Sequence, residues 1–496
     1  MKKITFLVAA FCIGAVCSVF GSSTTYSGTL PVLFINTDGG VAITSKEVYV
    51  SGTYYLDNLS LPGYESVGTA SSPLPLEIRG RGNYTWRDFD KKPYKLKLGV
   101  KQSLLGMNPS KHFALLAHAD DELAFLRNTV GFELSRMLGL EWTPAQQPVE
   151  VVLNGEYIGL YLLTENIRVA KTRVNIEEQT DNATDPNEIT GGWLIEIDNY
   201  DSDPHIAITE GNGCNINFTY KSPETLSDAQ SDYLTNQVVA MDAAIYNADK
   251  ASTEWEQLID MDVLARFYIV QEIMDNAESF HGSCYLHKQR GDNEKWKFGP
   301  VWDFGNAYRR AYDSGNNLFV YEKPPFGQTW IGEIAKYPRF QAKVREIWLQ
   351  FKAGSYASLN TFIDEFCNQI AAAAQANYKR WPQYGNSNIE QQKTIFTNTM
   401  AQRTIWLADQ WGDVTALPQT ERDDAQPIVY SPNIGRIYIS AEQPIEYIEI
   451  YNVPGILVAQ YENRGHEAEI MCPSGLHIVR IGTANGNTFT QKVLVK

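Results

Sequence analysis

The sequence has 496 residues, of which 42 are basic and 58 acidic, so its formal net charge is −16. So acidic a chain is a poor general binder of nucleic acid, although a local group of basic residues can still bind phosphate. The length suffices for two or three domains with sizeable cores. The cysteines beyond residue 21 lack metal-site spacing, and we expect most to be buried and unreactive: Cys214, Cys284, Cys367 and Cys472.

Residues 1–21 have the composition of a secretory signal peptide. Lys2 and Lys3 precede an uncharged apolar stretch that ends at a small residue before Ser22. This stretch is shorter than the roughly 20 apolar residues that span a bilayer. We therefore expect cleavage after residue 21 and export to the periplasm, the cell surface or the medium, with no membrane span in the mature chain. Lipidation at Cys17 or retention as an uncleaved anchor are the alternatives.

The first lobe, over about residues 30–220, is predicted to be rich in β-structure. Apolar spacing between residues 122 and 138 predicts one interposed helix, which ends at Gly139. Asn154-Gly155 is a strong hairpin signal. The alternation typical of half-buried strands occurs at 30–44, 47–56, 76–79, 94–98 and 149–163.

The second lobe, over about residues 225–417, is predicted to be mostly helical. Residues 418–427 are polar and are interpreted as a linker, and residues 428–496 alternate strand-like runs with Gly and Pro turns, as a small all-β sandwich does. The expected fold class is therefore α+β, with two lobes and a C-terminal β-sandwich. Helical periodicity covers 227–249, 259–275, 333–351 and 357–381.

A basic turn and strand form the first candidate site. Glycines let a backbone approach an anion closely, while arginine and lysine supply charge-assisted donors. A solvated basic hairpin is the alternative for such a turn. Strand alternation places two of the lysines, at 95 and 97, on one face. The residues concerned are Arg79, Arg81, Asn83, Lys92, Lys95 and Lys97.

Arg127 and Asn128 open the interposed helix, and Glu165 follows the Asn154-Gly155 hairpin. A kinase holds its phosphate-binding lysine with a carboxylate. A lysine between residues 92 and 97 paired with Glu165 would supply this arrangement, and an ordinary surface ion pair is the alternative.

The third candidate site combines residues 271–285 with residues 297–308. Asn276 and Glu278 precede Asp303 by about 25 residues, and oxygen ligands of this kind suit Mg²⁺ on nucleotide phosphates. A carboxylate of the first segment can orient an acceptor hydroxyl while Asp303 binds the metal. The alternative is structural, with Asp275 and Glu278 at a helix end and Asp303 in a turn.

Together these segments resemble the CotH (spore coat protein H) family of atypical protein kinases, in the same order along the chain. The resemblance covers residues 30–310 and extends through the helices to residue 410. It implies a compact, divergent kinase-like fold that uses ATP with Mg²⁺ or Mn²⁺ to phosphorylate Ser or Thr of protein partners. The matching segments are IRGRGNYTW, KKPYKLKL, SLLGM, FLRNTVGFELSRMLGL, VVLNGEYIGLYLLTENI and GPVWDFGNAY.

The resemblance also implies roles for individual residues. Glu278 and Asp303 would be catalytic, and Asp303 and Asn276 would bind the metal. The nucleotide would be bound by Arg79, Arg81, Asn83, Lys92, Lys95, Lys97, Arg127, Asn128 and Glu165.

Two residues depart from the family pattern. Glu278 stands where an aspartate is expected, and Gly305 stands where many members have a second aspartate. The extra methylene of Glu278 moves its carboxylate by more than about 1 Å, a displacement to which catalysis is sensitive. A weak kinase, altered acceptor choice and a catalytically impaired pseudokinase that acts as a surface binding or adhesion protein are all compatible with these changes.

Two further interpretations concern other classes of protein. Glu272 or Glu278 together with Asp303 could form the paired carboxylates of an exported carbohydrate-active enzyme, which would lie roughly 5 to 10 Å apart. Residues 428–496 resemble the C-terminal sorting domains of the Bacteroidetes type IX secretion route. A generic accessory domain that binds a surface glycan or protein is the alternative for this module.

Overall fold

The computed structural model describes residues 25–120, 123–200, 203–209, 211–213, 215–309, 317–323, 330–384, 388–413, 427–431, 435–452, 456–462 and 465–495. The predicted signal peptide with Cys17, residue Cys214 and positions 418–426 of the predicted linker lie outside these ranges. The chain divides into two compact units, Met1–Val414 and Thr415–Lys496. Within the described ranges, no helix is long and apolar enough to cross a membrane.

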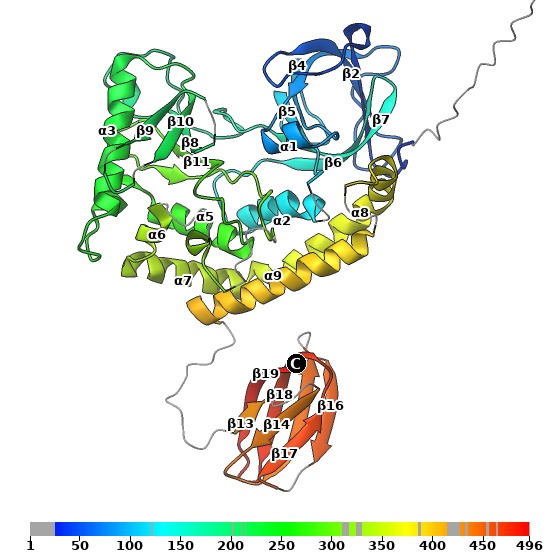
Figure 1. Ribbon diagram of the computed structural model, residues 1–496, viewed down its shortest axis with the longest axis vertical. Helices are drawn as coiled ribbons and strands as arrows, with labels where there is room; N and C mark the ends of the chain where they lie inside the picture. The colour runs from blue at the N-terminus through cyan, green and yellow to red at the C-terminus, as the bar shows by residue number, and fades with distance from the viewer. Residues whose placement is uncertain are drawn as a thin grey trace, which may run out of the picture. The chain divides into compact units, whose positions relative to one another are not determined.

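The first seven strands of unit 1 close into a barrel (Figure 1). Its strand order is β1-β2-β3-β4-β5-β7-β6, and the parallel pairing of β1 with β6 closes it. Apolar side chains that alternate along these strands fill the interior, among them the fully buried Ile78, Phe113 and Val151. The strands are β1 (Val32–Thr37), β2 (Val50–Asp57), β3 (Leu74–Gly80), β4 (Tyr94–Gln102), β5 (Ser110–Leu116), β6 (Gln146–Leu153) and β7 (Glu156–Glu165).

A second sheet of five strands has the order β12-β11-β8-β10-β9. Its central strand β8 pairs with β10 on one side and with β11 on the other. Strands from before and after residue 225 therefore share one sheet, so the predicted change of character at that residue is not a boundary in space. The strands are β8 (Trp193–Ile197), β9 (His205–Ile208), β10 (Ile216–Ser222), β11 (Cys284–Lys288) and β12 (Lys297–Phe298).

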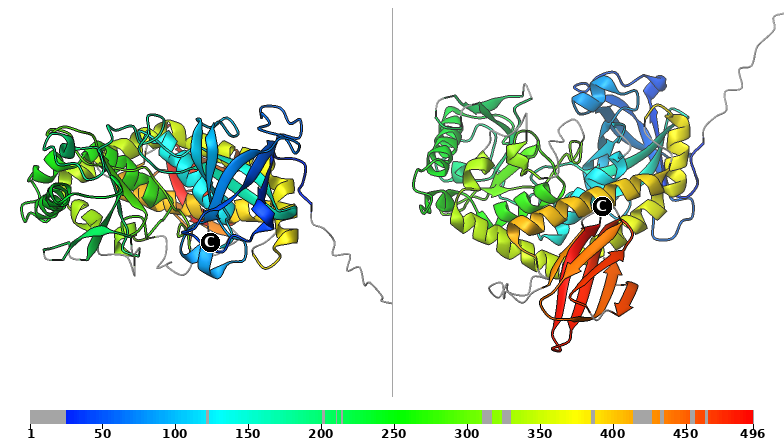
Figure 2. Two further views of the ribbon diagram at one scale, coloured as in Figure 1. Left: turned by 90° about the horizontal axis from the view of Figure 1, so that it is seen from above. Right: turned by 60° about the horizontal axis from the view of Figure 1, so that its bottom comes forward.

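Helices pack along the barrel and the second sheet (Figures 1 and 2). Ser227 and Gln230 form a reciprocal capping box at the start of α3, and Asp260 caps α5. The α-helices are α1 (Tyr84–Asp88), α2 (Ala124–Met137), α3 (Asp228–Ile245), α4 (Glu254–Leu258), α5 (Met261–Ile273), α6 (Trp330–Ile334), α7 (Pro338–Ala353), α8 (Ser358–Arg380) and α9 (Ile389–Trp411). Short 3₁₀ helices lie at η1 (Asp38–Gly40), η2 (Glu188–Thr190), η4 (Val320–Glu322) and η5 (Ser355–Ala357).

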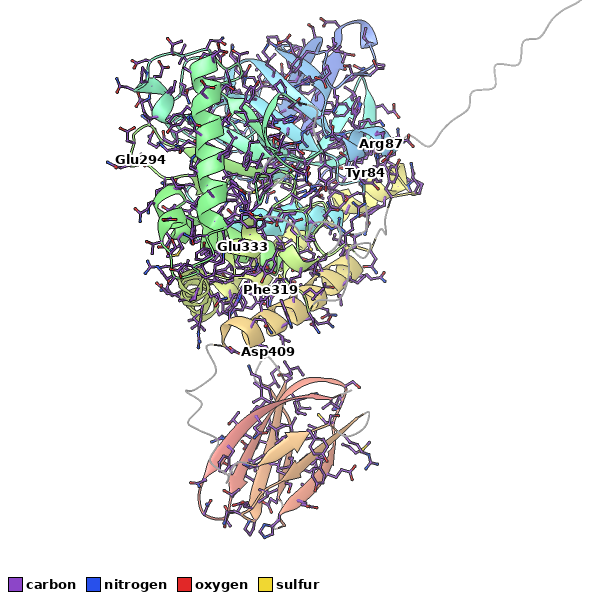
Figure 3. All side chains as sticks on the ribbon, turned by 60° about the vertical axis from the view of Figure 1, so that its left-hand side comes forward. Tyr84, Arg87, Glu294, Phe319, Glu333 and Asp409 are labelled. Atoms are coloured by element: carbon purple, nitrogen blue, oxygen red, sulfur yellow. The ribbon has the colours of Figure 1, made fainter. Side chains whose placement is uncertain are left out.

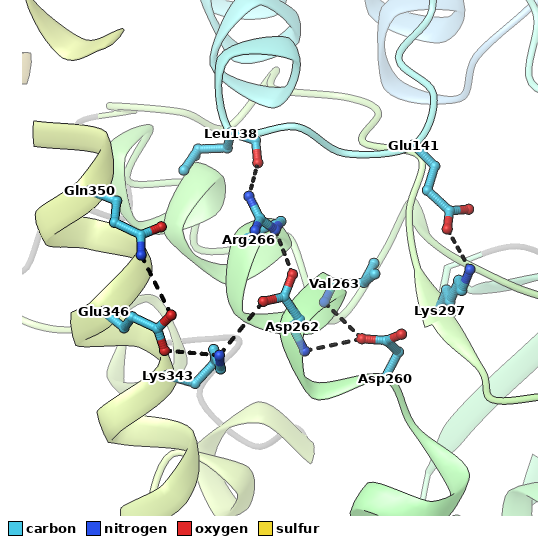
Figure 4. Close-up of polar contacts among 10 residues, drawn as sticks. All are labelled: Leu138, Glu141, Asp260, Asp262, Val263, Arg266, Lys297, Lys343, Glu346 and Gln350. Carbon is cyan, nitrogen blue, oxygen red and sulfur yellow. Dashed lines mark hydrogen bonds and ion pairs between the residues drawn. The ribbon is translucent and has the colours of Figure 1, made fainter. Parts of the chain in front are cut away.

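Two contacts hold elements near the candidate site, one on α5 and one on segment 317–323. Arg266 donates to Asp262 on its own helix at 2.6 Å and to the carbonyl of Leu138 after α2 at 2.7 Å (Figure 4). In segment 317–323, the ring of Phe319 packs at a tilt against Trp406 of α9 with centroids 4.8 Å apart, and Figure 3 shows Phe319 beside that helix. Helix α5 is thus tied to α2, and segment 317–323 to α9.

Unit 2 consists of two antiparallel sheets with a common core. One sheet has the order β13-β14-β17 and the other β16-β15-β18-β19. Ile439 of the first sheet and Ile448 and Val479 of the second are fully buried in one cluster. The strands are β13 (Ile428–Tyr430), β14 (Arg436–Ser440), β15 (Ile445–Asn452), β16 (Leu457–Glu462), β17 (Glu467–Met471), β18 (Gly475–Thr483) and β19 (Thr488–Val495).

The expected mixed α+β class is confirmed, as is the hairpin at Asn154-Gly155, where both residues have positive φ. The helix predicted at residues 122–138 is α2. Cys284, Cys367 and Cys472 are buried free thiols, as expected.

Candidate active site

The turn after α5 carries Asn276 and Glu278, two of the three residues predicted for this site. Asp275 has a φ of 50°, which turns the chain sharply after the helix. The Asn276 Nδ2 then donates to the Gln271 side chain at 3.0 Å and to the Asp303 carbonyl at 3.2 Å. Its Oδ1 is buried and accepts no hydrogen bond within the described residues. Since such an oxygen is costly to leave unsatisfied, it is a good candidate for a cation ligand.

Asp303 lies on the loop that this turn contacts. Its φ is 54°, its side chain is exposed, and its Oδ1 accepts the backbone N–H of Gly305 at 3.0 Å. The Glu278 carboxyl is near enough for the Asp303 charge to act on it. The structure therefore brings Asn276, Glu278 and Asp303 near one another, and their roles in catalysis and metal binding stay predictions.

Glu278 is half-buried, and its electrostatic surroundings suit proton transfer. Burial first and the negative charge of Asp303 second raise its pKa to about 7. The neighbouring Tyr200 side chain acts on the pKa of Glu278 in the opposite direction. A carboxyl with a pKa near neutrality can serve as a general base at neutral pH.

Helix α2 supports the Asp303 loop from the other side. The Asn128 Oδ1 accepts the backbone N–H of Phe304 at 3.0 Å, and the Arg127 guanidinium donates to the carbonyl of Gly305. Arg127 also pairs with Asp120 at 3.0 Å. These contacts give Arg127 and Asn128 a supporting role for the loop, and their contact with a nucleotide stays a prediction.

His118 contributes to this support, and sequence reasoning missed it. Its Nε2 lies 3.3 Å from Asn128 Nδ2, which orients the amide oxygen toward Phe304. Burial, followed by the charges of Lys91 and Arg127, lowers the pKa of His118 to about 3. The ring is therefore neutral and can accept the amide proton.

Gly131 allows the Phe304 ring to pack directly on α2. A Cβ at this position would lie 2.4 Å from two atoms of the ring, far below contact distance. Alanine normally stabilises a helix relative to glycine, but here we expect Gly131→Ala to lower the free energy of unfolding by about 1–3 kcal/mol through overpacking. Urea denaturation will measure this. Gly332→Ala in α6, where the nearest atom is 3.4 Å away, is the matched control, and equal effects at both positions would contradict the packing argument.

Arg81, which directly follows β3 of the barrel, lies near the acidic group. The Arg81 guanidinium lies 5.4 Å from the centre of the Trp302 ring, and burial lowers its pKa while the charges of Asp303 and Glu196 act to raise it. Lys95 lies opposite Arg79 on the neighbouring strand. Arg81 thus joins the barrel to the Asp303 loop.

Lys95 is the lysine best placed to bind an anion. Burial first and the charges of Arg79 and Arg81 next lower its pKa to about 8. Within the described part of the chain, its ammonium forms neither a hydrogen bond nor an ion pair. A phosphate would neutralise this concentration of positive charge.

The other residues of the basic turn have partners of their own. Lys97 shares a face with Lys95, as predicted, but pairs with Glu77 at 2.7 Å. Lys92 donates to the carbonyl of Trp86 at 2.6 Å, and the exposed Asn83 accepts from Lys46 at 2.5 Å. Of the three predicted lysines, Lys95 is therefore the one that the structure leaves available.

The expected pair of Glu165 with a lysine of β4 is not formed. The buried Glu165 instead accepts the backbone N–H of Ala145 at 3.0 Å and lies 3.7 Å from the Arg173 guanidinium. Arg173 stacks on Phe113, the cross-strand neighbour of Glu165, and so reaches this carboxylate. Burial raises the pKa of Glu165. Its assignment as a partner of the phosphate-binding lysine was wrong.

Strand β8 and the residue directly after it supply two carboxylates that sequence reasoning missed. Glu196 pairs with Lys221 at 3.0 Å and stands opposite Tyr285 on β11. Its pKa is raised to about 7, and burial is the largest cause. Asp198 follows two residues later, and its charge acts on Glu278. The available signal was two acidic residues at i and i+2, which share a face where the backbone is extended.

Glu272 lies in a different environment from Glu278. It is completely buried and forms an ion pair with Arg403 of α9. It is therefore a structural residue and cannot belong to a pair of catalytic carboxylates in an open groove.

Within the described ranges, no three His, Cys, Asp or Glu side chains form a metal-binding group by themselves. A metal here would need the Asn276 amide, water or substrate oxygens in addition to Asp303.

A cavity of about 260 Å³ lies elsewhere, between the end of α2 and β11. Its lining includes Trp142, Arg173 and His287 and no predicted site residue. Arg173 and His287 are already bonded to carbonyl oxygens, so few free polar groups remain to orient a ligand.

Comparison with known proteins gives one family. The family model described as CotH kinase protein matches residues 77–407, which include all the predicted site residues. No curated protein matches the sequence.

Proposed function

This chain belongs to the CotH kinase protein family, and from that premise we propose that it is an exported atypical protein kinase. It transfers phosphate from ATP, with Mg²⁺ or Mn²⁺, to Ser or Thr of protein partners. The barrel and the helix-rich part of unit 1 would be the two lobes of a divergent kinase-like domain.

The main support is the convergence of Asn276, Glu278 and Asp303 near Arg81, whose charge also acts on Lys95 of the barrel. The metal would supply charge neutralisation at the transferring phosphoryl group. Asp303 and the buried Asn276 Oδ1 are the residues of this chain that would hold it. Lys95 and Arg81 would bind phosphate oxygens, because neither cation has a direct carboxylate partner within the described residues.

Glu278 would take the proton of the acceptor hydroxyl. Its pKa of about 7 leaves a large fraction ionised at neutral pH while keeping it basic enough to accept a proton. Helix α2 would keep the metal-binding loop in place through Arg127 and Asn128.

Calorimetric titration of ATP with Mg²⁺ or Mn²⁺ into the purified chain tests this proposal. We expect metal-dependent binding that is lost in Asp303→Ala, since this substitution removes a metal ligand. Asp409→Ala at the end of α9 is the matched control and should bind as the unmodified chain does. Absence of ATP binding to the unmodified chain would contradict the kinase proposal.

A surface binding protein that retains the kinase fold is the second candidate. The observation in its favour is Gly305, which contributes only backbone contacts to the loop where a second carboxylate would bind metal. Nucleotide binding without transfer to any acceptor would favour this pseudokinase.

Export is part of the proposal and rests on the composition of residues 1–21. The two sheets of unit 2 and their common core are what a small β-sandwich requires. Such a sandwich would serve as a secretion or sorting module, and the mature protein would reside in the periplasm, on the cell surface or in the medium. Cell fractionation of chains with and without residues 427–496 would test this role.

A further inference from the structure

The two sheets of unit 2 differ in width, with three strands in one and four in the other. Strand β13 lies against β19, and the Gln491 side chain donates to the carbonyl of Pro427 at 2.5 Å. Figure 1 shows β16 on the side of the unit away from β13. On that side, the Tyr461 hydroxyl of β16 lies 3.5 Å from the carbonyl oxygen of Met471 on β17. The three-stranded sheet therefore ends at β17 and leaves β16 without a strand opposite it.

The side formed by β16 and β17 exposes apolar side chains. Residues 456–458, at the start of β16, are Ile, Leu and Val and are 41–64% exposed, and Met471 of β17 is 69% exposed. Tyr461 stands opposite the fully buried Ile448 and so lies on the inner face of β16, yet it is 38% exposed. An inner face that remains partly exposed means that the core of the sandwich is incomplete here.

Strand β17 directs backbone hydrogen-bonding groups to this side. Ala441 donates its backbone N–H to the carbonyl of His466, and in this register the even-numbered residues of β17 bond to β14. The alternation of an antiparallel pair then points the N–H and C=O groups of Glu469 and Met471 away from β14. Within the described part of unit 2, no strand pairs with β17 on that side. Such an edge can accept a further strand.

Charge determines which kind of strand fits this edge. Glu467 and Glu469 lie on the outer face of β17, because Ile470, which alternates with them, is buried in the core. Strand β16 adds Glu462, and neither strand contains Lys or Arg. Arg436 of β14 pairs with Glu469 at 2.9 Å and offsets one of these charges. The outer face of the edge is therefore acidic, while its inner face is apolar.

A second copy of this chain fits the edge poorly. Pairing of β17 with β17 would place Glu467 and Glu469 of both copies on one face of a joined sheet, and like charges on neighbouring strands are destabilising. A strand with Lys or Arg beside the two glutamates and apolar residues at the alternate positions fits instead. Its basic side chains would lie on the outer face, and its apolar side chains would cover Tyr461.

We propose that the edge of β17 binds an extended segment of a partner protein, in which basic and apolar residues alternate, as a fourth strand of the three-stranded sheet. The segment would bond to the backbone of Glu469 and Met471. The contact of Tyr461 with the Met471 carbonyl is long for a hydrogen bond, so a backbone N–H of the partner can replace it. This inference is independent of the kinase proposal, because unit 2 lies outside the residues that match the family.

Fluorescence anisotropy of labelled synthetic peptides with the full chain tests the proposal. The probes are a peptide of alternating Lys and Val, a peptide of the same composition with Lys and Val in separate blocks, and a peptide of alternating Glu and Val. We expect the alternating Lys–Val peptide to bind at least about tenfold more tightly than either of the others, because it alone has both the charge and the spacing. Its binding should slow hydrogen exchange at the amides of Glu469 and Met471.

Two variants locate the contact on β17. Glu469→Pro removes an N–H that points to the partner and none that bonds to β14, so it should abolish binding. Glu467→Lys combined with Glu469→Lys should reverse the preference to the Glu–Val peptide, and it keeps the test valid if the proline variant does not fold. Glu365→Lys combined with Asp409→Lys makes the same charge change at exposed positions of unit 1 and should leave the preference unchanged.

Three results would overturn the proposal. Equal binding of the alternating and block Lys–Val peptides would mean that charge alone attracts them. Binding that survives Glu469→Pro and the double lysine substitution would place the contact elsewhere on the chain. Dimerisation of the unmodified chain in sedimentation, lost in Glu469→Pro, would show that a second copy occupies the edge.

Discussion

Glu278→Gln is expected to reduce phosphoryl transfer by about 10²–10⁴-fold while leaving the binding of ATP and metal unchanged, because the amide cannot accept the acceptor proton. The carboxylate lies on the turn beside Asp303, but the contacts that fix that turn are made by Asn276 rather than by Glu278. Transfer to peptides and calorimetry of ATP binding on the same preparations will separate the two effects.

Glu278→Asp is the matched control, since it keeps the charge and shortens the side chain by one methylene. It should retain measurable transfer to peptides. Full activity of Glu278→Gln would exclude Glu278 as the base and would favour a mechanism in which the acceptor loses its proton to water.

The pKa of Glu278 predicts how this activity depends on pH. Burial first and the charge of Asp303 second raise it from 4.5 to about 7, so transfer should rise with pH through about 7 and level off above it.

The folded state binds the proton of Glu278 more tightly than the unfolded state, so ionisation of Glu278 lowers stability as pH rises from 4.5 to about 7. The Glu278→Gln variant should lack this contribution, and urea denaturation at pH 5 and pH 8 will show whether it does.

Local chemistry explains which parts of the fold could be predicted from the sequence. The hairpin at Asn154-Gly155 follows from two adjacent residues that adopt positive φ, and α2 follows from apolar spacing that ends at Gly139. The pairing of β8 with β11 joins residues separated by three helices, and no local pattern records it. The five-stranded sheet was therefore not anticipated.

In the candidate site, too, features set by local sequence could be predicted and features set by long-range contacts could not. Asn276, Glu278 and Asp303 were singled out because a family pattern links two distant segments that residue chemistry alone left ambiguous. The Glu165–Arg173 pair was missed, because burial and cross-strand geometry decide which cation reaches a carboxylate. Nor could the sequence reveal that Arg127 and Asn128 bind backbone groups of the Asp303 loop, more than 170 residues away.

The second large effect is expected at Arg403, at the centre of a buried ionic network. Its Nε donates to the carbonyl of Glu272 at 2.8 Å, its Nη1 donates to the carbonyl of Leu318 at 2.7 Å, and its Nη2 pairs with the Glu272 carboxylate. Lys323 pairs with Asp275 at 2.7 Å beside it. The network therefore joins α9, the end of α5 and segment 317–323.

Arg403→Met should lower the free energy of unfolding of unit 1 by about 3–5 kcal/mol, because it leaves the fully buried Glu272 charge without its partner. Urea denaturation measures this, and adding Glu272→Gln should recover part of the loss, since the uncompensated charge is then removed as well. Arg87→Met is the control. Arg87 pairs with Asp88 on the surface (Figure 3), where such pairs contribute about 0–1 kcal/mol.

The same substitution should also impair transfer, because Asp275 directly precedes Asn276 and its positive-φ conformation is fixed by this network. We expect a fall in kcat with little change in ATP affinity, since Lys95 and Arg81 lie on the barrel and not on this turn. A loss of stability without any change in kcat would mean that the turn keeps its geometry through the Asn276 contacts with Gln271 and Asp303 alone. A cost below about 1 kcal/mol would instead show that Glu272 takes up a proton and is neutral without Arg403.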